Sequence, residues 1–238
     1  MEDNAFGTEV FLNWLRDPAP EVFQRRHWLA HQQMQFSFLL QRGLHCADRV
    51  LDVGCGPMRL GSVLLPFLTH GWYFGQDINP ETLRLGETVL QRLGVSAERC
   101  TLIASDDFSF AGVEDHSIDL AFSNSLFSHL SLNSILRCLL AVAAKLKPDG
   151  RFYATFFLLP SGSDWQQPCR RNKWGVEFFT HPCLDPFHYS EAMIASLAGH
   201  AGLRMELDHD FGHPTQTMAV FFGSPHGHAA DHPEGAVT

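Results

Sequence analysis

The chain has little lysine for its 238 residues, and this shortage limits its partners. Only three lysines occur (Lys145, Lys147 and Lys173), acidic residues outnumber lysine and arginine by 26 to 17, and the formal net charge is −9. A surface that neutralises a phosphate backbone needs clustered cations. We therefore expect no nucleic acid as a partner.

Long apolar runs and paired cysteines are also missing. No apolar run reaches the roughly 18 residues of a transmembrane helix, and the start of the chain is acidic where a signal peptide would be basic. The six cysteines show no CxxC spacing. We expect a cytoplasmic protein with reduced thiols and no membrane contact. No metal is expected either, because the spacing of one Cys- and His-containing segment matches no zinc site: Cys169, His181, Cys183 and His188.

What the sequence does contain is an alternation of short apolar runs with helical stretches. Five runs indicate strands, at 50–53, 73–76, 100–104, 118–123 and 151–158. Apolar residues at helical spacing lie between them, at 60–68, 80–93 and 132–146. This alternation predicts an α/β fold with a doubly wound, mostly parallel sheet and helices on both faces.

The last two predicted strands, 203–208 and 217–222, follow a helix at 190–201 with Ser190 as its N-cap. The connection between these strands is so short that they must pair antiparallel. The prediction is thus a seven-stranded sheet with an antiparallel last strand.

Three further segments complete the expected organisation. Residues 1–45 form an N-terminal helical cap with helices at 6–15 and 20–42, and residues 46–223 form the main domain. Within that domain, 160–189 is too long for a simple connection. Residues 224–238 lack periodicity and are expected to be disordered.

The most informative segment is a strand that runs into a glycine turn, Val50-Leu51-Asp52-Val53-Gly54-Cys55-Gly56-Pro57. Glycine permits close approach of a ligand, and the helix that follows offers unpaired N–H groups. Asp52 would repel a pyrophosphate but attract a sulfonium or ammonium group. The third glycine of a dinucleotide motif would stand at Arg59, so NAD-type binding is disfavoured.

Asp52-Val53-Gly54-Cys55-Gly56 resembles the first motif of class I S-adenosylmethionine-dependent methyltransferases, and the continuation to Gly61 resembles a subset of bacterial members. The resemblance spans residues 49–222 and implies a Rossmann-like methyltransferase domain with S-adenosylmethionine as cofactor. It implies that Asp52, Gly54 and Gly56 contact the methionine and ribose parts of the cofactor. Met58 stands where the motif commonly has a third glycine.

The same resemblance assigns roles to polar residues after the next three strands. It implies that Asp77 accepts hydrogen bonds from the ribose hydroxyls, although an acid there could instead cap the next helix, a role better suited to Asn79. It implies that Asp106 accepts from the adenine amino group with Asp107 beside it, unless both acids only cap a loop. Asn124 begins the motif that borders the methyl group.

A base is needed only if the acceptor must lose a proton. His129 and His213 both follow strands at the expected crevice, and either is a candidate. Residues 160–189 are predicted to form a substrate lid because they combine aromatic residues with cations: Trp165, Trp174, Phe178, Phe179, Phe187, Arg170, Arg171 and Lys173. The alternative is that these aromatics only anchor the loop.

The predicted function is methyl transfer to a small-molecule acceptor, at oxygen or nitrogen rather than carbon. A protein methyltransferase and a non-catalytic cofactor-binding protein remain as alternatives. The sequence specifies neither the acceptor nor the oligomeric state, because fold alone does not supply them.

Overall fold

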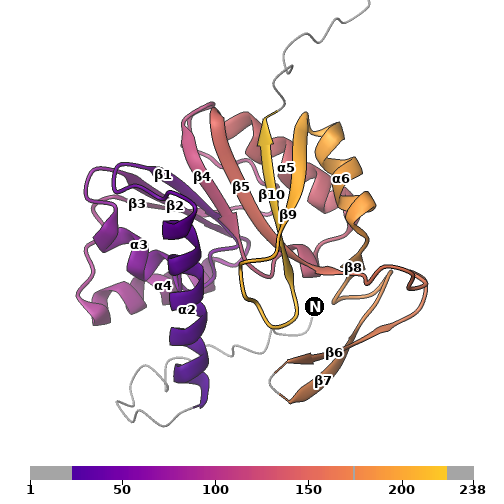
Figure 1. Ribbon diagram of the computed structural model, residues 1–238. Coiled ribbons are helices and arrows are strands. Elements are labelled where there is room, and N and C mark those ends of the chain that lie inside the picture. The colour runs from indigo at the N-terminus through magenta and orange to yellow at the C-terminus, as the bar shows by residue number, and fades with distance from the viewer. Residues whose placement is uncertain (1–22, 174, 224–238) are drawn as a thin grey trace, which may run out of the picture.

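The computed structural model describes residues 23–173 and 175–223, and Figure 1 shows a central sheet with helices on both sides. The predicted helix at 6–15, the tail at 224–238 and Trp174 lie outside the described residues.

The helices are α2 (Phe23–Gln41), α3 (Gly61–Phe67), α4 (Pro80–Leu93), α5 (Leu132–Lys145) and α6 (Glu191–His200), with a short 3-10 helix η1 (Phe127–His129). The strands are β1 (Arg49–Val53), β2 (Trp72–Asp77), β3 (Cys100–Ala104), β4 (Ile118–Ser123), β5 (Leu146–Leu158), β6 (Cys169–Lys173), β7 (Val176–Thr180), β8 (His188–Tyr189), β9 (Leu203–Asp208) and β10 (Thr217–Gly223).

The main sheet has the strand order β3-β2-β1-β4-β5-β10-β9, and the two-residue strand β8 pairs with the end of β5. Strands β1 to β5 are parallel to one another, whereas β10 is antiparallel to both β5 and β9. The predicted mostly parallel sheet with a reversed last strand is therefore confirmed. Its parallel strands share one carboxyl edge, where ligands of such sheets bind.

Two apolar cores hold the layers together. Each strand contributes side chains to both cores, because successive side chains of a strand point to opposite faces of the sheet. Val50 belongs to the core under α2, α3 and α4, and Leu51 belongs to the core under α5 and α6. In Figure 1, α2 crosses one face of the sheet and α5 lies behind it.

Local signals explain where the helices start and stop. Asn79 caps α4 through its side chain, Pro80 occupies the first turn, and Gly94 ends the helix in the left-handed conformation at φ 65°. Ser190 caps α6 as predicted, with its side chain accepting from the Met193 N–H. These caps fix the helix ends, and hence the loops at the carboxyl edge.

Two parts of the prediction need correction. Strand β5 begins at Leu146 and not at residue 151. It pairs with β4 through Leu146 opposite Ile118 and through Arg151 opposite Leu120, and the residues between Leu146 and Arg151 form an irregularity in the pairing. Residues 160–189 are not all loop, because β6 and β7 form a separate two-stranded hairpin. The local signal for this hairpin was Gly175, whose φ of 84° suits the tight turn just before β7.

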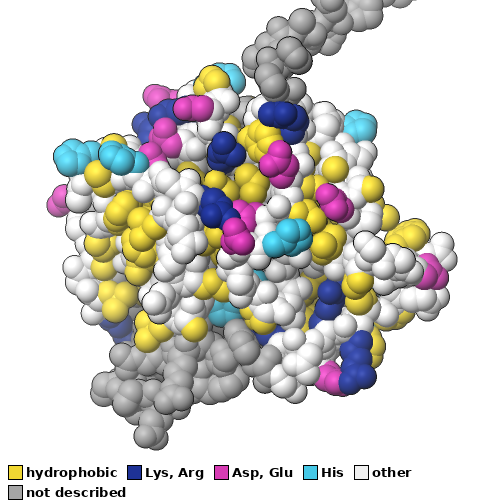
Figure 2. Space-filling view, in the orientation of Figure 1, with side chains coloured by type: hydrophobic (Ala, Val, Ile, Leu, Met, Phe, Trp, Pro, Cys, Tyr) yellow, Lys and Arg dark blue, Asp and Glu magenta, His cyan; other side chains and the backbone are white. Residues whose placement is uncertain are grey.

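The charges on the surface and the lengths of the helices are relevant to the partners expected from the sequence. On the face in Figure 2, cationic and acidic side chains are interspersed. Among the described residues, no helix is both long enough and apolar enough to cross a bilayer.

Candidate active site

The glycine turn after β1 directs its backbone N–H groups at the end of β2. Gly54 and Gly56 have φ of 72° and 56°, and no atom lies within 4 Å of a Cβ built on Gly56. The N–H groups of Gly54 and Cys55 donate to the Gln76 carbonyl, each at 2.8 Å, and that of Gly56 donates to Asp77 at 3.0 Å. None of these three is left for a pyrophosphate, yet the outer side of Gly56 stays open to a ligand.

Met58 takes the backbone conformation that the missing third glycine would favour. Its φ is 65°, and its side chain is fully buried. Room for that side chain comes from two glycines, because a Cβ on Gly61 or on Gly86 would lie 2.5 Å from a Met58 carbon. The turn therefore keeps its path although the sequence departs from the common motif.

Asp52 lies beneath this turn, and it is 4% exposed. The Tyr73 hydroxyl donates to its Oδ2 at 2.7 Å. Burial raises the pKa of Asp52 to about 7, while the Tyr73 hydrogen bond and the positive charge of Arg59 act in the opposite direction. A buried acid of this kind stabilises a positively charged ligand group once it is ionised.

Asp77 ends β2 beside the turn. Its Oδ2 accepts from Gly56 and its Oδ1 accepts from the Asn79 N–H at 2.9 Å. Burial raises its pKa, and these backbone hydrogen bonds oppose the rise. Asn79, not Asp77, caps α4, so the helix-cap alternative for Asp77 is excluded. Each carboxylate oxygen keeps a lone pair that a ribose hydroxyl can use.

The two acids after β3 differ in their surroundings. Asp107 accepts from the Ser105 hydroxyl at 2.6 Å and from the Ser109 N–H at 2.9 Å, and these bonds lower its pKa to about 2. Asp107 thus shapes its own loop. Asp106 is exposed and forms no side-chain hydrogen bond with any residue that the structure describes. Its carboxylate is therefore accessible to a ligand.

Polar side chains gather where β4 and β5 approach the start of β10. The Gln216 Oε1 accepts from the Thr155 hydroxyl at 2.6 Å and from the Ser125 hydroxyl at 3.2 Å. Asn124 donates to Ser125 at 3.1 Å, but its own Oδ1 is buried without a partner among the described residues. Sequence reasoning found Asn124 and missed Thr155 and Gln216, because only the fold brings three strands together here.

The two candidate bases carry their protons on opposite nitrogens. The His213 Nδ1 accepts from the N–H groups of Thr215 and Gln216, at 3.2 and 2.9 Å. Nδ1 therefore has no hydrogen, and the neutral ring must carry its proton on Nε2. Burial lowers the His213 pKa to about 3, so the ring stays neutral. These contacts make His213 a hydrogen-bond donor, which differs from the predicted role as a base.

His129 has the reverse arrangement. Its Nδ1 lies 2.6 Å from the Asp185 carboxylate, which can only accept, so Nδ1 donates. The Nε2 of the neutral ring then keeps a lone pair for a proton. The His129 side chain is 46% exposed and follows β4 on η1.

Helix α2 covers the site from the side of β1 and β10. Its inward face carries Trp28, His31, Gln32 and Gln35, at the three- and four-residue spacing of one helix stripe. Gln32 donates to the Arg59 carbonyl at 2.7 Å and to the Ser62 hydroxyl at 2.8 Å. The predicted helical cap therefore contributes polar groups to the site, which its apolar periodicity alone did not reveal.

One segment of the chain matches a known family in sequence. Residues 51–152 match the family model described as a methyltransferase domain. This segment, which is less than half of the chain, is a methyltransferase domain of the class I S-adenosylmethionine-dependent kind. The matched segment contains the glycine turn, Asp77 and Asn124, which all lie at the shared carboxyl edge of the sheet.

Solved structures of methyltransferases share the fold of this chain. An S-adenosylmethionine-dependent methyltransferase from Clostridium acetobutylicum ATCC 824 has a TM-score of 0.60 at 13% identity, covering 91% of this chain and 99% of that one. Magnesium protoporphyrin IX methyltransferase from Synechocystis PCC 6803, with S-adenosylmethionine bound, gives 0.57 at 15% identity over 90% and 91%. Mitomycin 7-O-methyltransferase gives 0.56 at 16% identity over 79% of this chain, which spans only 53% of that protein.

Family and neighbours imply S-adenosylmethionine as the cofactor. The residues present fit that group. Gly56 leaves open space, Asp106 is accessible, and the buried Asn124 Oδ1 has no partner among the described residues. The negative charges of Asp52 and Asp77 suit a ligand with a sulfonium and an ammonium group.

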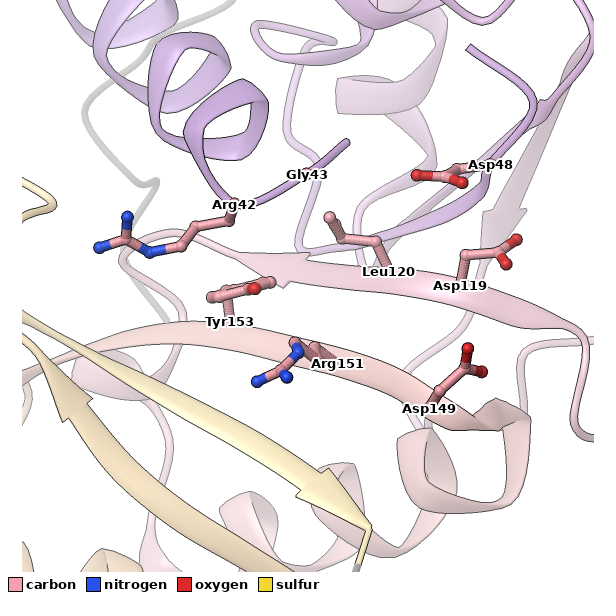
Figure 3. A pocket seen from close by; sticks show the side chains of 8 residues that line it. All are labelled: Arg42, Gly43, Asp48, Asp119, Leu120, Asp149, Arg151 and Tyr153. Carbon is pink, nitrogen blue, oxygen red and sulfur yellow. The ribbon is translucent and has the colours of Figure 1, made fainter. Parts of the chain in front are cut away.

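A pocket of about 200 Å³ lies elsewhere on the molecule, between the end of α2 and strands β4 and β5 (Figure 3). Asp119 and Asp149 lie toward the amino ends of their strands. Since ligands of such sheets bind at the carboxyl edge, this pocket is not the active site.

Proposed function

We propose that the protein transfers a methyl group from S-adenosylmethionine to a small-molecule acceptor, at oxygen or nitrogen. The observation that carries this proposal is the position of α2 over the site. Gln32 ties the helix to the turn that follows Gly56, and Trp28 and Gln35 are buried beneath it. A site roofed in this way suits a small acceptor better than an extended polypeptide.

In this proposal the residues at the carboxyl edge of the sheet bind and orient the cofactor. Asp52, Gly54, Gly56, Asp77, Asp106, Asp107 and Asn124 hold and orient the cofactor, which supplies a methyl group already activated by its sulfonium. Close alignment of the two reactants contributes roughly 7–11 kcal/mol to such a transfer. The chain therefore acts mainly by positioning and by excluding water.

His129 is the base in this proposal. Asp185 holds the ring through Nδ1, which leaves Nε2 to take a proton from an acceptor hydroxyl. The proton thus moves from the acceptor oxygen to His129 Nε2. His213 donates from Nε2 and takes no proton.

The first test is calorimetric binding of S-adenosylmethionine and S-adenosylhomocysteine, with NAD as a control ligand. We expect micromolar binding that is lost in Asp77→Ala and kept in Asp115→Ala, because Asp115 lies on the surface beside Lys145. Transfer of a radiolabelled methyl group to small molecules and to peptides then follows.

Each outcome has a distinct meaning. Labelled small molecules support the proposal, and labelled peptides alone would replace it by protein methylation. Binding without transfer to any acceptor would leave a non-catalytic cofactor-binding protein. Failure of the folded protein to bind S-adenosylmethionine would remove the proposed function altogether.

A further inference from the structure

Three buried side-chain atoms of α2 and of the β9–β10 connection have no hydrogen-bond partner among the described residues. They are Gln35 Oε1, His213 Nε2 and Thr215 Oγ1. A buried polar atom without a partner costs about 1–3 kcal/mol. Because native folds pair nearly all of their buried polar atoms, three unpaired ones in neighbouring positions indicate a place for a ligand.

Ring contacts place Gln35 opposite His213. The centroid of the His31 ring of α2 lies 5.3 Å from that of His213, and the Phe38 ring of α2 lies 5.0 Å from that of Phe211. The rings of Phe211 and His213 are themselves stacked. Gln35 is four residues after His31 and three before Phe38, so it belongs to the same stripe of the helix. Gln35 is 3% exposed and therefore faces these two stacked rings.

Hydrogen bonds connect His213 to the residues assigned to the cofactor. The N–H groups of Thr215 and Gln216 both donate to His213 Nδ1. The Gln216 Oε1 accepts from the Ser125 hydroxyl, which in turn accepts from the Asn124 amide. Since Asn124 holds the cofactor in the proposed function, a ligand bound at His213 lies beside the methyl donor.

The three unpaired atoms define the chemical group that fits them. His213 Nδ1 accepts two hydrogens, so Nε2 carries the proton of the neutral ring and donates. The Gln35 Oε1 is an amide oxygen and only accepts, whereas the Thr215 hydroxyl does both. A donor that faces an acceptor matches the C=O and the N–H of a carboxamide. A carboxylate offers no hydrogen to Gln35.

Arg59 lies on the cofactor side of these atoms. Its guanidinium stacks on Trp28, nearer the start of α2 than Gln35, at 4.8 Å from the ring centroid. Arg59 also follows the glycine turn in the chain, and its positive charge acts on Asp52 beneath that turn. The three atoms opposite one another thus all belong to uncharged side chains.

We propose that Gln35, His213 and Thr215 bind a carboxamide group of the methyl acceptor. The His213 Nε2–H donates to the carbonyl oxygen, the Gln35 Oε1 accepts from the N–H, and the Thr215 hydroxyl completes the set. This assignment rests on the proposed function, because it names the class of small molecule that receives the methyl group. The expected acceptors are uncharged molecules that carry an amide or a lactam.

Three probes of similar shape test the site on the full chain loaded with S-adenosylhomocysteine. Benzamide has both the carbonyl and the N–H, acetophenone has only the carbonyl, and benzoate carries a charge. Calorimetry should show benzamide binding about tenfold tighter than either of the other two, because both leave the Gln35 Oε1 without a hydrogen. Tighter binding of benzoate, or equal binding of all three, would overturn the carboxamide assignment.

Two variants remove one partner each. Gln35→Met keeps the length of the side chain and should abolish the preference for benzamide over acetophenone. His213→Asn keeps an oxygen that accepts from the backbone N–H groups but has no donor at Nε2, so it should weaken both probes about tenfold. Gln91→Met and His200→Asn are the matched controls, since both residues are exposed on other helices, and they should change no affinity.

Affinity for S-adenosylhomocysteine shows whether each variant is folded, and we expect it to be unchanged in both. If either variant fails to fold, Thr215→Val takes its place, because valine keeps the size of the side chain without the hydroxyl. It should lower the affinity for benzamide. Variants that fold and still prefer benzamide as the wild type does would contradict the proposal.

The remaining outcomes separate this site from the activity itself. If the loaded protein binds none of the probes at millimolar concentration, the carboxamide site is wrong while the methyltransferase function stands. If S-adenosylhomocysteine does not bind to the folded wild type, the proposed function fails first. The two failures are therefore distinguishable.

Discussion

The Asp52 carboxyl is buried beside the Tyr73 hydroxyl, and burial raises its pKa from 3.8 to about 7. A positively charged cofactor favours the ionised form. The affinity for S-adenosylmethionine should therefore rise by about fivefold from pH 6 to pH 7, as the fraction of ionised Asp52 increases. Calorimetry across this interval measures the change, and Asp52→Asn should bind weakly with no such pH dependence.

The raised pKa of Asp52 also predicts how the stability of the fold depends on pH. Because the folded protein keeps a proton that the unfolded chain releases, the free energy of unfolding should fall as pH rises from about 4 to about 7. Urea unfolding of the wild type and of Asp52→Asn measures this slope. An identical slope in both proteins would show that Asp52 does not titrate in this range.

Also at the residue scale, the two histidines show what hydrogen bonds add to a sequence. Both follow strands at the carboxyl edge, and the sequence treats them alike. The structure gives His129 a carboxylate partner and His213 two backbone N–H partners. Opposite tautomers follow from these neighbours, which lie beyond the reach of any local pattern.

At the scale of elements, α4 and the glycine turn are fitted to each other through one side chain. A Cβ on Gly86 would lie 2.5 Å from the Met58 Cγ. Gly86→Ala should therefore destabilise the protein by about 1–3 kcal/mol through overpacking. It should also weaken S-adenosylmethionine binding, because Met58 adjoins the turn.

Gly199 of α6 provides the matched control, since no atom lies within 4 Å of a Cβ built there. Gly199→Ala should be neutral or stabilising by up to about 1 kcal/mol, as alanine favours helix. Chemical unfolding of both variants makes the comparison. Equal effects would show that the contact with Met58 is not what matters at Gly86.

The elements that the sequence predicted well are those with local signals. Helix α4 matches its predicted bounds because Asn79, Pro80 and Gly94 mark both ends, and β3, β4 and β9 match because they are short apolar runs between turns. The hairpin of β6 and β7 was missed because β6 is a polar run and because only Thr180 of the two strands is buried, so neither strand shows the apolar pattern of the main sheet. The left-handed Met58 was missed because it depends on two glycines that lie apart in sequence.

At the scale of the whole molecule, the hairpin lies outside the main sheet, so cofactor and acceptor binding should be separable. Replacing residues 164–179 by a short glycine linker should leave S-adenosylhomocysteine affinity within about twofold. Methyl transfer should be lost, because the predicted substrate lid is removed with the hairpin. Calorimetry and the radiolabel assay read the two effects, and retained transfer would contradict the lid.

The position of β10 has a consequence for how the chain is made. Strands β1 to β5 pair with one another as they are synthesised, but β9 has no neighbour until β10 follows it, and β10 then takes its place between β5 and β9. It brings four buried side chains with it: Met218, Ala219, Val220 and Phe221. Until that moment the edges of β5 and β9 that β10 will cover are open to neighbouring chains, so the nascent protein is most exposed to aggregation just before β10 is complete.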